Sequence, residues 1–338
     1  MTAKANRAAT WGLALLLSAP AAGAANGARA VDGASATRAR HAALPGASGG
    51  PSPGLPFQLR SVEDEMGAKG EIRAVVHHPF AIAGAALADA SRWCDVLILH
   101  LNTKNCRSST EDARTILHVA IGSKHDQRPA DAHGMEFHYG VGAGDSNHLR
   151  VQLGAPRGPL GTSDYRIVLE AEPARSGQTS IRLAYSFSHG VVAKLAMQAY
   201  LGTIARDKVG FTVIGREADG RPRYIGGMRG VVERNAMRYY LAVEAYLGAL
   251  SAPPGERVEK SLRDWFTATE RYPRQLHEMG RDDYLAMKRR EYRLGQAPGK
   301  ATGTPEAGSS PARRRTAGQE DAVKLDSGRN DPPTRKTP

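Results

Sequence analysis

The sequence predicts an α+β domain over residues 57–295, in which a curved antiparallel sheet packs on a long amphipathic helix and further helices follow. Three observations predict it. Apolar and polar residues alternate in successive segments between residues 115 and 188, which indicates an antiparallel meander. The longest helical pattern comes after these strands, at 231–250. Two shorter helical patterns, at 257–270 and 282–294, then end the domain.

The domain begins with a strand and a helical segment. Alternating apolar residues predict a first strand that ends at Val76. Pro79 has no N–H to donate to a sheet and commonly starts a helix. Residues 81–101 are predicted to be helical, in two pieces that break near Ser91, with an apolar stripe that includes Trp93.

The meander follows, and the strands are predicted at 115–121, 135–141, 149–153, 165–172 and 181–187. A helix at 191–203 separates them from the long helix at 231–250. The long helix carries Tyr239 and Tyr240 and ends before Pro253.

The N-terminal residues predict a secretory signal. Lys4 and Arg7 precede an apolar stretch at 11–19, which is shorter than the roughly 20 residues that a transmembrane helix needs. Small residues then favour cleavage after Ala24, with Ala30 as the second choice. The alternative is an uncleaved anchor helix. The sequence therefore predicts an exported protein, periplasmic or secreted, with a signal peptide at residues 1–24.

Both ends outside the domain have low complexity. Residues 25–56 consist mainly of Ala, Gly, Ser and Pro and are predicted to be a disordered linker, and residues 296–338 a disordered basic tail. The formal net charge is +12, but more than half of this excess lies in these ends and the signal peptide. The remaining mild positive balance fits attraction to anionic membrane surfaces or cell-wall polymers rather than nucleic acid.

Cys94 and Cys106 are the two cysteines of the chain. In an oxidising compartment a lone pair at this separation favours a disulfide, which would join the end of the helical segment to the loop after it. Two buried free thiols are the alternative.

No motif points to a cofactor, a metal or a known catalytic centre. The sequence has no glycine-rich nucleotide-binding pattern and no Gly-x-Ser-x-Gly nucleophile elbow. His133 and His138 do not have the i, i+4 spacing of a zinc-binding helix. We therefore expect no cofactor and no metal site, and the sequence leaves open whether the protein is an enzyme.

The order of elements, from the strand ending at Val76 to the helix at 231–250, resembles the START-like (helix-grip, SRPBCC) superfamily. The resemblance implies a sheet that wraps the long helix, with a cavity between them of the kind that commonly holds lipids, sterols or other apolar molecules. The sequence departs from this pattern in the helix at 191–203 and in the helices after residue 257. Two shorter stretches, 208–212 and 233–240, are similar to those of uncharacterised exported bacterial proteins, which implies no activity.

The resemblance makes polar and aromatic side chains of the sheet and the long helix candidates for a ligand site. Tyrosine presents an apolar body and a polar tip, which suits a cavity wall and equally an ordinary core. Arg150 and Glu170 interrupt apolar strands, either as a buried pair or on an exposed outer face. The candidates are Trp93, Tyr139, Arg150, Tyr165, Glu170, Tyr185, Arg234, Asn235, Tyr239 and Tyr240.

These expectations lead to one main hypothesis and two alternatives. The main hypothesis is an exported protein that binds or carries an apolar or amphipathic small molecule. The first alternative is a cyclase- or hydrolase-like enzyme that uses Glu170, Arg234 or a histidine in the same cavity. The second is a structural, envelope-associated protein, whose basic helices at 257–294 lie on an anionic membrane surface or pack on the domain.

Overall fold

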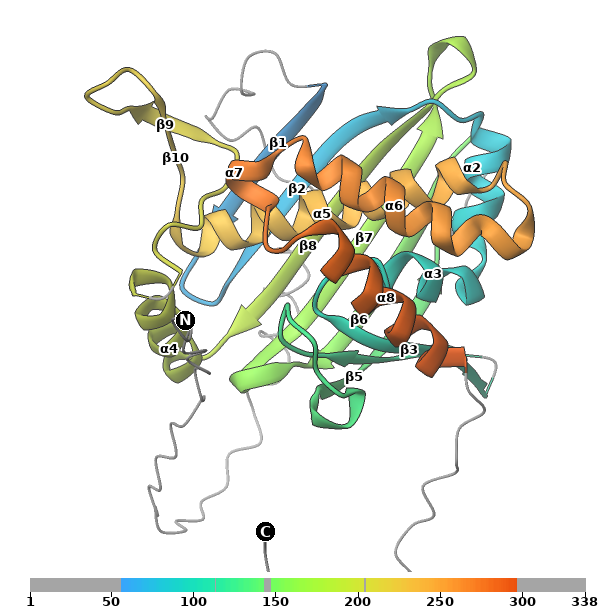
Figure 1. Cartoon of the computed structure of the whole chain (residues 1–338), viewed down its shortest axis with the longest axis horizontal. Coiled ribbons are helices and arrows are strands. Elements are labelled where there is room, and N and C mark those ends of the chain that lie inside the picture. Colours follow the sequence, from blue (N-terminus) through green and yellow to red (C-terminus); the bar gives the residue numbers. More distant parts are fainter. Residues whose placement is uncertain (1–55, 113, 143–146, 204, 297–338) are drawn as a thin grey trace, which may run out of the picture. The chain divides into compact units, whose positions relative to one another are not determined.

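An eight-stranded antiparallel sheet, in the strand order β1-β2-β8-β7-β6-β5-β4-β3, forms one layer of the protein (Figure 1). The computed structural model describes residues 56–112, 114–142, 147–203 and 205–296. The strands are β1 (Phe57–Glu63), β2 (Gly67–Val76), β3 (Thr103–Glu111), β4 (Arg114–Ile121), β5 (His133–Val141), β6 (Leu149–Arg157), β7 (Thr162–Pro173) and β8 (Thr179–His189). The predicted antiparallel meander is therefore confirmed.

The main helices form further layers on one side of this sheet (Figure 1). They are α2 (Phe80–Ala88), α3 (Trp93–Leu97), α4 (Val191–Gly202), α5 (Gly227–Ala249), α6 (Arg257–Glu270), α7 (Pro273–Leu276) and α8 (Arg281–Gln296), and a small hairpin of β9 (Val213–Arg216) and β10 (Pro222–Tyr224) precedes α5. Helix α5 packs on β1, β2 and β8, α6 packs on α5, and α8 packs on α6 and β3. This arrangement confirms the predicted α+β class, with a long helix on a curved sheet and extra C-terminal helices.

Helix α5 approaches the sheet most closely where it crosses β2. A Cβ atom at Gly70 would lie 2.4 Å from the carbonyl oxygen of Val232, a separation that atoms do not tolerate. Glycine at this position therefore lets two backbones touch. The contact fixes where α5 sits on the β1–β2–β8 half of the sheet.

Helices α6 and α8 bury their apolar faces against the rest of the domain. Leu262, Trp265 and Tyr284 are almost completely buried, and the Trp265 and Tyr284 rings stack with their centroids 5.0 Å apart. The apolar side chains that the membrane-surface alternative would place in a bilayer are thus inside the protein. Within the described ranges, no helix combines the length and the apolar character needed to span a bilayer.

Three buried charged groups connect α8 to β3. Lys288 donates from Nζ to the carbonyl oxygens of His100 and Thr103, at 2.6 and 2.7 Å, and to Glu291 at 2.8 Å. Lys104 donates to the other oxygen of Glu291 at 2.9 Å. Because each charged atom has charged or carbonyl partners, the C-terminal helix can cover the polar edge strand without leaving a charge unpaired.

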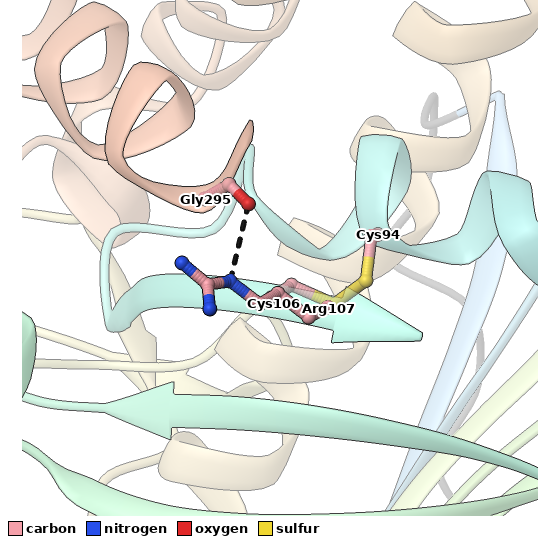
Figure 2. Close-up of a disulfide and its surroundings, with 4 residues drawn as sticks. All are labelled: Cys94, Cys106, Arg107 and Gly295. Atoms are coloured by element: carbon pink, nitrogen blue, oxygen red, sulfur yellow. Dashed lines mark hydrogen bonds between the residues drawn. A yellow bond between two sulfur atoms is a disulfide. The ribbon is translucent and has the colours of Figure 1, made fainter. Parts of the chain in front are cut away.

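Cys94 and Cys106 form a disulfide, as predicted, with Cα atoms 5.3 Å apart (Figure 2). Cys94 lies in α3 and Cys106 in β3, so the bridge joins a helix to an edge strand. The next residue, Arg107, donates to the carbonyl oxygen of Gly295 at the end of α8 (Figure 2), and also to that of Leu294. The C-terminal end of α8 therefore meets two segments that precede it by almost two hundred residues.

The structure corrects the sequence prediction in two places. The segment after residue 101 was expected to be a loop, but it is the edge strand β3; its sequence is too polar to show apolar alternation. β1 was missed because a serine, Ser61, occupies one of its buried positions. The predicted signal peptide (1–24), almost all of the predicted linker (25–56) and almost all of the predicted tail (296–338) lie outside the described residues.

Candidate ligand-binding site

A row of aromatic rings lines the inner face of the sheet and continues onto α5. The centroids of Tyr165 and Phe187 are 5.4 Å apart, those of Tyr165 and Tyr185 6.3 Å, and those of Tyr185 and Tyr239 5.6 Å. The ring of His100 then stacks on Tyr239 at 4.8 Å. These positions face inward because strand side chains alternate between faces, and Tyr185 and Phe187 follow the buried Ile181 and Leu183 in phase.

Solvent reaches the inner side of α5 at Asn235. This residue is only partly buried, although Arg234, Ala236 and Tyr239 around it are buried. The Asn235 side chain hydrogen-bonds His100 and Tyr185 and so borders the aromatic row. The hydroxyl of Tyr165 contacts that of Thr162 at 2.9 Å. The hydroxyl of Tyr239 makes no hydrogen bond to any residue in the described part of the chain, so it is the polar group of the row that a small molecule could use.

Two arginines of α5 are buried next to this row. Arg234 is 5% and Arg238 2% exposed. Arg238 donates from Nη2 to Glu278 at 2.7 Å, but its Nε has no hydrogen-bond partner among the described residues, and neither has Nη1 of Arg234. Buried guanidinium groups normally have their donors paired. Nε of Arg166 and Nε of Arg182 also lack a partner among the described residues, but Arg234 and Arg238 are the two such arginines that share one face of α5.

Lys124, Lys208, Arg234 and Arg238 form a group of cations that we call the basic cluster. Glu278 is the carboxylate that balances their charge. It accepts hydrogen bonds from Lys124, Lys208 and Arg238. Burial alone would raise the pKa of Glu278, but Arg238 and Lys124 outweigh it and lower the pKa to about 2. The carboxylate is therefore ionised at neutral pH, and four cations share it.

The excess of positive charge is visible in the neighbouring groups. Burial, reinforced by Arg238, lowers the pKa of Arg234 to about 10 and that of Lys124 to about 8. Burial and the charge of Arg238 also hold the pKa of His100 well below its usual value, so its ring is neutral at pH 7. The Nδ1 atom of His100 accepts from the backbone N–H of Asn102 at 3.2 Å, which assigns the proton to Nε2, on the side of the Asn235 side chain.

Arg150 and Glu170 lie on the other face of the sheet. They form an ion pair with each other on this outer face. Glu170 also pairs with Arg182, and Arg182 pairs with Glu71. Their neighbours Leu149, Val151, Leu169 and Ala171 face inward. The pair therefore stabilises the sheet and does not take part in the site beside α5.

Tyr240 points away from the aromatic row. Adjacent residues of a helix differ by about 100° in direction, so Tyr239 and Tyr240 cannot share a face. Tyr240 lies near Glu244, Arg271 and Tyr272, on the side of α6 and α7. Burial raises its pKa.

Trp93 and Tyr139 have structural partners. Trp93 is buried, and its Nε1 donates to the carbonyl oxygen of Leu87 at 2.9 Å. Tyr139 donates its hydroxyl hydrogen to the carbonyl oxygen of Ala88 at 2.7 Å. Both bonds satisfy carbonyl groups around the end of α2. Among the predicted ligand-binding residues, the structure thus brings together Tyr165, Tyr185, Arg234, Asn235 and Tyr239.

The sequence analysis missed His100, Phe187, Arg238 and the basic cluster's carboxylate, Glu278. Arg238 follows Arg234 by four residues and therefore shares its helix face, a spacing that was visible in the sequence. Lys124 and Glu278 approach α5 from remote segments, and no local pattern marks them.

A hollow of about 700 Å³ lies elsewhere, on β3, β4 and β5, and is lined by Arg107, His118 and Glu136 among others. Nearby, the Ser109 hydroxyl contacts Nε2 of His118 at 2.8 Å, and Nδ1 of His118 lies 3.8 Å from Glu136. Ser109 also donates to Glu111, and His118 and Glu136 are well exposed. We interpret these contacts as a polar row across three strands. No group of three or more His, Cys, Asp or Glu side chains in the described residues is arranged to hold a metal ion.

No protein-family model matches this chain, and a search of curated proteins found no match. The comparison with solved structures finds matches of low TM-score. One is the Zhui aromatase/cyclase from Streptomyces sp. R1128, with 13% identity, a TM-score of 0.26 and coverage of 40% of this chain and 74% of that one. Another is a truncated norcoclaurine synthase from Thalictrum flavum, with 11% identity, a TM-score of 0.29 and coverage of 45% and 89%. Ara h 8.0201 has 12% identity, a TM-score of 0.30 and coverage of 56% and 99%.

Proposed function

We propose that this protein binds a small molecule with an aromatic or other apolar body between α5 and the sheet, against the row of Tyr165, Tyr185, Phe187 and Tyr239. The observation that carries the proposal is the partly accessible Asn235 on the inner side of an otherwise buried helix segment. An apolar body would bury surface against the rings, and the polar tips would orient it.

The geometry favours binding over the enzymatic alternative that uses Glu170. A general acid or base must reach the reacting group within hydrogen-bond distance. Glu170 instead faces the opposite side of the sheet, where Arg150 and Arg182 hold it. Glu170 therefore cannot act on a molecule beside α5, and the function that we propose is that of a binding or carrier protein.

A fluorescent naphthylamine tests the proposal. N-phenyl-1-naphthylamine is neutral and apolar, and we expect it to bind saturably at one site per chain. Tyr239→Ala removes a ring of the row and should weaken binding about tenfold. Tyr240→Ala is the matched control because it truncates the neighbouring buried tyrosine on the other helix face. Absence of saturable binding, or equal loss in both variants, would contradict the proposal.

We also propose that the chain is exported and that cleavage after Ala24 produces the mature protein. The basic start, the short apolar stretch and the small residues before Ala25 support this. Intact-mass measurement of the protein isolated from its host should give a chain that begins at Ala25. A chain that retains residues 1–24 would contradict the proposal.

A further inference from the structure

The buried arginines of α5 leave donors that the described part of the protein does not use. Nη1 of Arg234 and Nε of Arg238 are buried and lack a partner among the described residues. An unpaired buried donor costs free energy, and the cost is greater for a charged group. Two such charged donors, one helical turn apart on α5, therefore indicate a place where an acceptor from outside completes the structure.

Neither nearby carboxylate supplies that acceptor. Glu278 already accepts from Lys124, Lys208 and Arg238. Glu233 accepts from the hydroxyls of Ser61 and Thr212 and from the backbone N–H groups of Phe211 and Thr212, so both of its oxygens are occupied. The acidic groups near the basic cluster are thus committed to other donors.

The open donors also border the aromatic row. Arg234 and Arg238 are one helical turn apart, and Asn235 between them lies beside His100 and Tyr185. His100 in turn stacks on Tyr239. A molecule that lies on the rings can therefore reach the guanidinium groups with one end.

We propose that the ligand of this site is an amphiphile, whose aromatic or apolar body lies on the ring row and whose single anionic group, a carboxylate, phosphate or sulfonate, is bound by Arg234 and Arg238. This inference rests on the proposed function and specifies its ligand class. Oxygen anions accept charge-assisted hydrogen bonds from guanidinium groups, and they would neutralise the charge that Glu278 leaves uncompensated.

Arg234 offers a clean variant because its side chain makes no hydrogen bond or close ion pair with another described residue. It shares Glu278 with three other cations, and replacing such a buried charge by an apolar side chain of similar length removes a desolvation cost. Arg234→Met should therefore keep or raise the midpoint of urea unfolding of the ligand-free protein. Arg206→Met is the matched control, since it removes the same charge from a side chain that is 74% exposed.

Two naphthalene probes separate the anionic group from the apolar body. 8-Anilinonaphthalene-1-sulfonate carries a sulfonate on the skeleton of N-phenyl-1-naphthylamine. The wild-type protein should bind the sulfonate more tightly than the neutral probe, and Arg234→Met should weaken the sulfonate about tenfold to a hundredfold while the neutral probe is unaffected. Arg234→Lys should keep part of the preference, and Arg206→Met all of it.

The outcomes distinguish the two proposals. If the neutral probe binds through Tyr239 but the sulfonate has no Arg234-dependent advantage, the anionic ligand class is wrong and the binding function stands. If neither probe binds saturably, both proposals fail. Where the preference is found, displacement of the sulfonate by 1-naphthoate and by 1-naphthyl phosphate, with neutral 1-naphthol as control, identifies which anion the arginines favour.

Discussion

Arg238 in the middle of α5 donates a hydrogen bond across 2.7 Å to Glu278, which lies between α7 and α8. The two groups connect the helix that faces the sheet to the C-terminal segment that covers it. Glu278 is also the partner of Lys124 and Lys208, so one carboxylate holds four segments together.

The first prediction concerns acid stability. The pKa of Glu278 is lowered to about 2 in the folded protein, against an ordinary value of 4.5. The unfolded chain therefore takes up the proton first, and the stabilisation by Glu278 is complete above pH 4.5 and is lost as the pH falls towards 2. Its size is about 3 kcal/mol. Urea unfolding between pH 2 and 7 should show this loss, and Glu278→Gln should remove that part of the pH dependence.

Glu244→Gln provides the control for that measurement. Glu244 pairs with Arg271 at 3.0 Å, and the two side chains are 36% and 52% exposed. A solvent-screened pair contributes up to about 1 kcal/mol. A wild-type-like pH profile in Glu278→Gln, or an equal change in Glu244→Gln, would show that Glu278 is not the titrating group.

The second prediction concerns the buried cluster under α8. Lys288→Met leaves Glu291 with Lys104 as its cation and leaves two carbonyl oxygens without their donor. We expect the free energy of unfolding to fall by about 3–5 kcal/mol. Arg290→Met breaks the exposed ion pair between Arg290 of α8 and Asp126. This substitution should change the free energy of unfolding by less than about 1 kcal/mol. Similar effects of the two substitutions in urea unfolding would refute the buried cluster's role.

The third prediction concerns the contact between α5 and β2. A Cβ at Gly70 would collide with the carbonyl of Val232, so Gly70→Ala must push the helix from the sheet, at a cost of about 1–3 kcal/mol. Gly134 also lies in a strand, but a Cβ there meets no atom within 4 Å. Gly134→Ala should be neutral or slightly stabilising. Thermal unfolding of both variants measures this difference. A Gly70→Ala protein as stable as the wild type would contradict the predicted contact between α5 and β2.

The fourth prediction concerns the Cys94–Cys106 bridge. Breaking it frees a loop of about a dozen residues, which in the loop-entropy model costs about 3 kcal/mol. Urea unfolding with and without a thiol reductant should show this loss in the wild-type protein and not in the Cys94→Ser/Cys106→Ser variant. A wild-type protein that is insensitive to reductant, or that contains two titratable thiols, would disprove it.

Periodicity predicted much of this fold, because it reports which face of an element is buried. The strands at 115–121 and 181–187 and the helix at 257–270 appear as expected. The same rule would have placed Arg150 outside, since Leu149 and Val151 are the inward residues. It would also have separated Tyr240 from Tyr239. In both cases the sequence held the answer, but residue chemistry was given more weight than position.

Other features could not be found in the sequence. β3 is an edge strand whose buried positions include Thr103 and Lys104, and the partners of these polar groups come from α8, almost two hundred residues later. The basic cluster likewise combines α5 with Lys124 and Glu278, which only the tertiary structure brings together. Long-range polar contacts of this kind leave no periodic trace.

Gly70 has a consequence for protein engineering. The contact between the backbones of Gly70 and Val232 anchors α5 on β2, and α5 also packs on β1 and β8. Three other buried side chains of the interior, Leu117, Phe137 and Leu153, come from β4, β5 and β6. Redesign of these three side chains can change the volume and shape of the interior without touching the anchor. A small combinatorial library at these three positions would therefore test how the interior beside the aromatic row affects binding, with the position of α5 left unchanged.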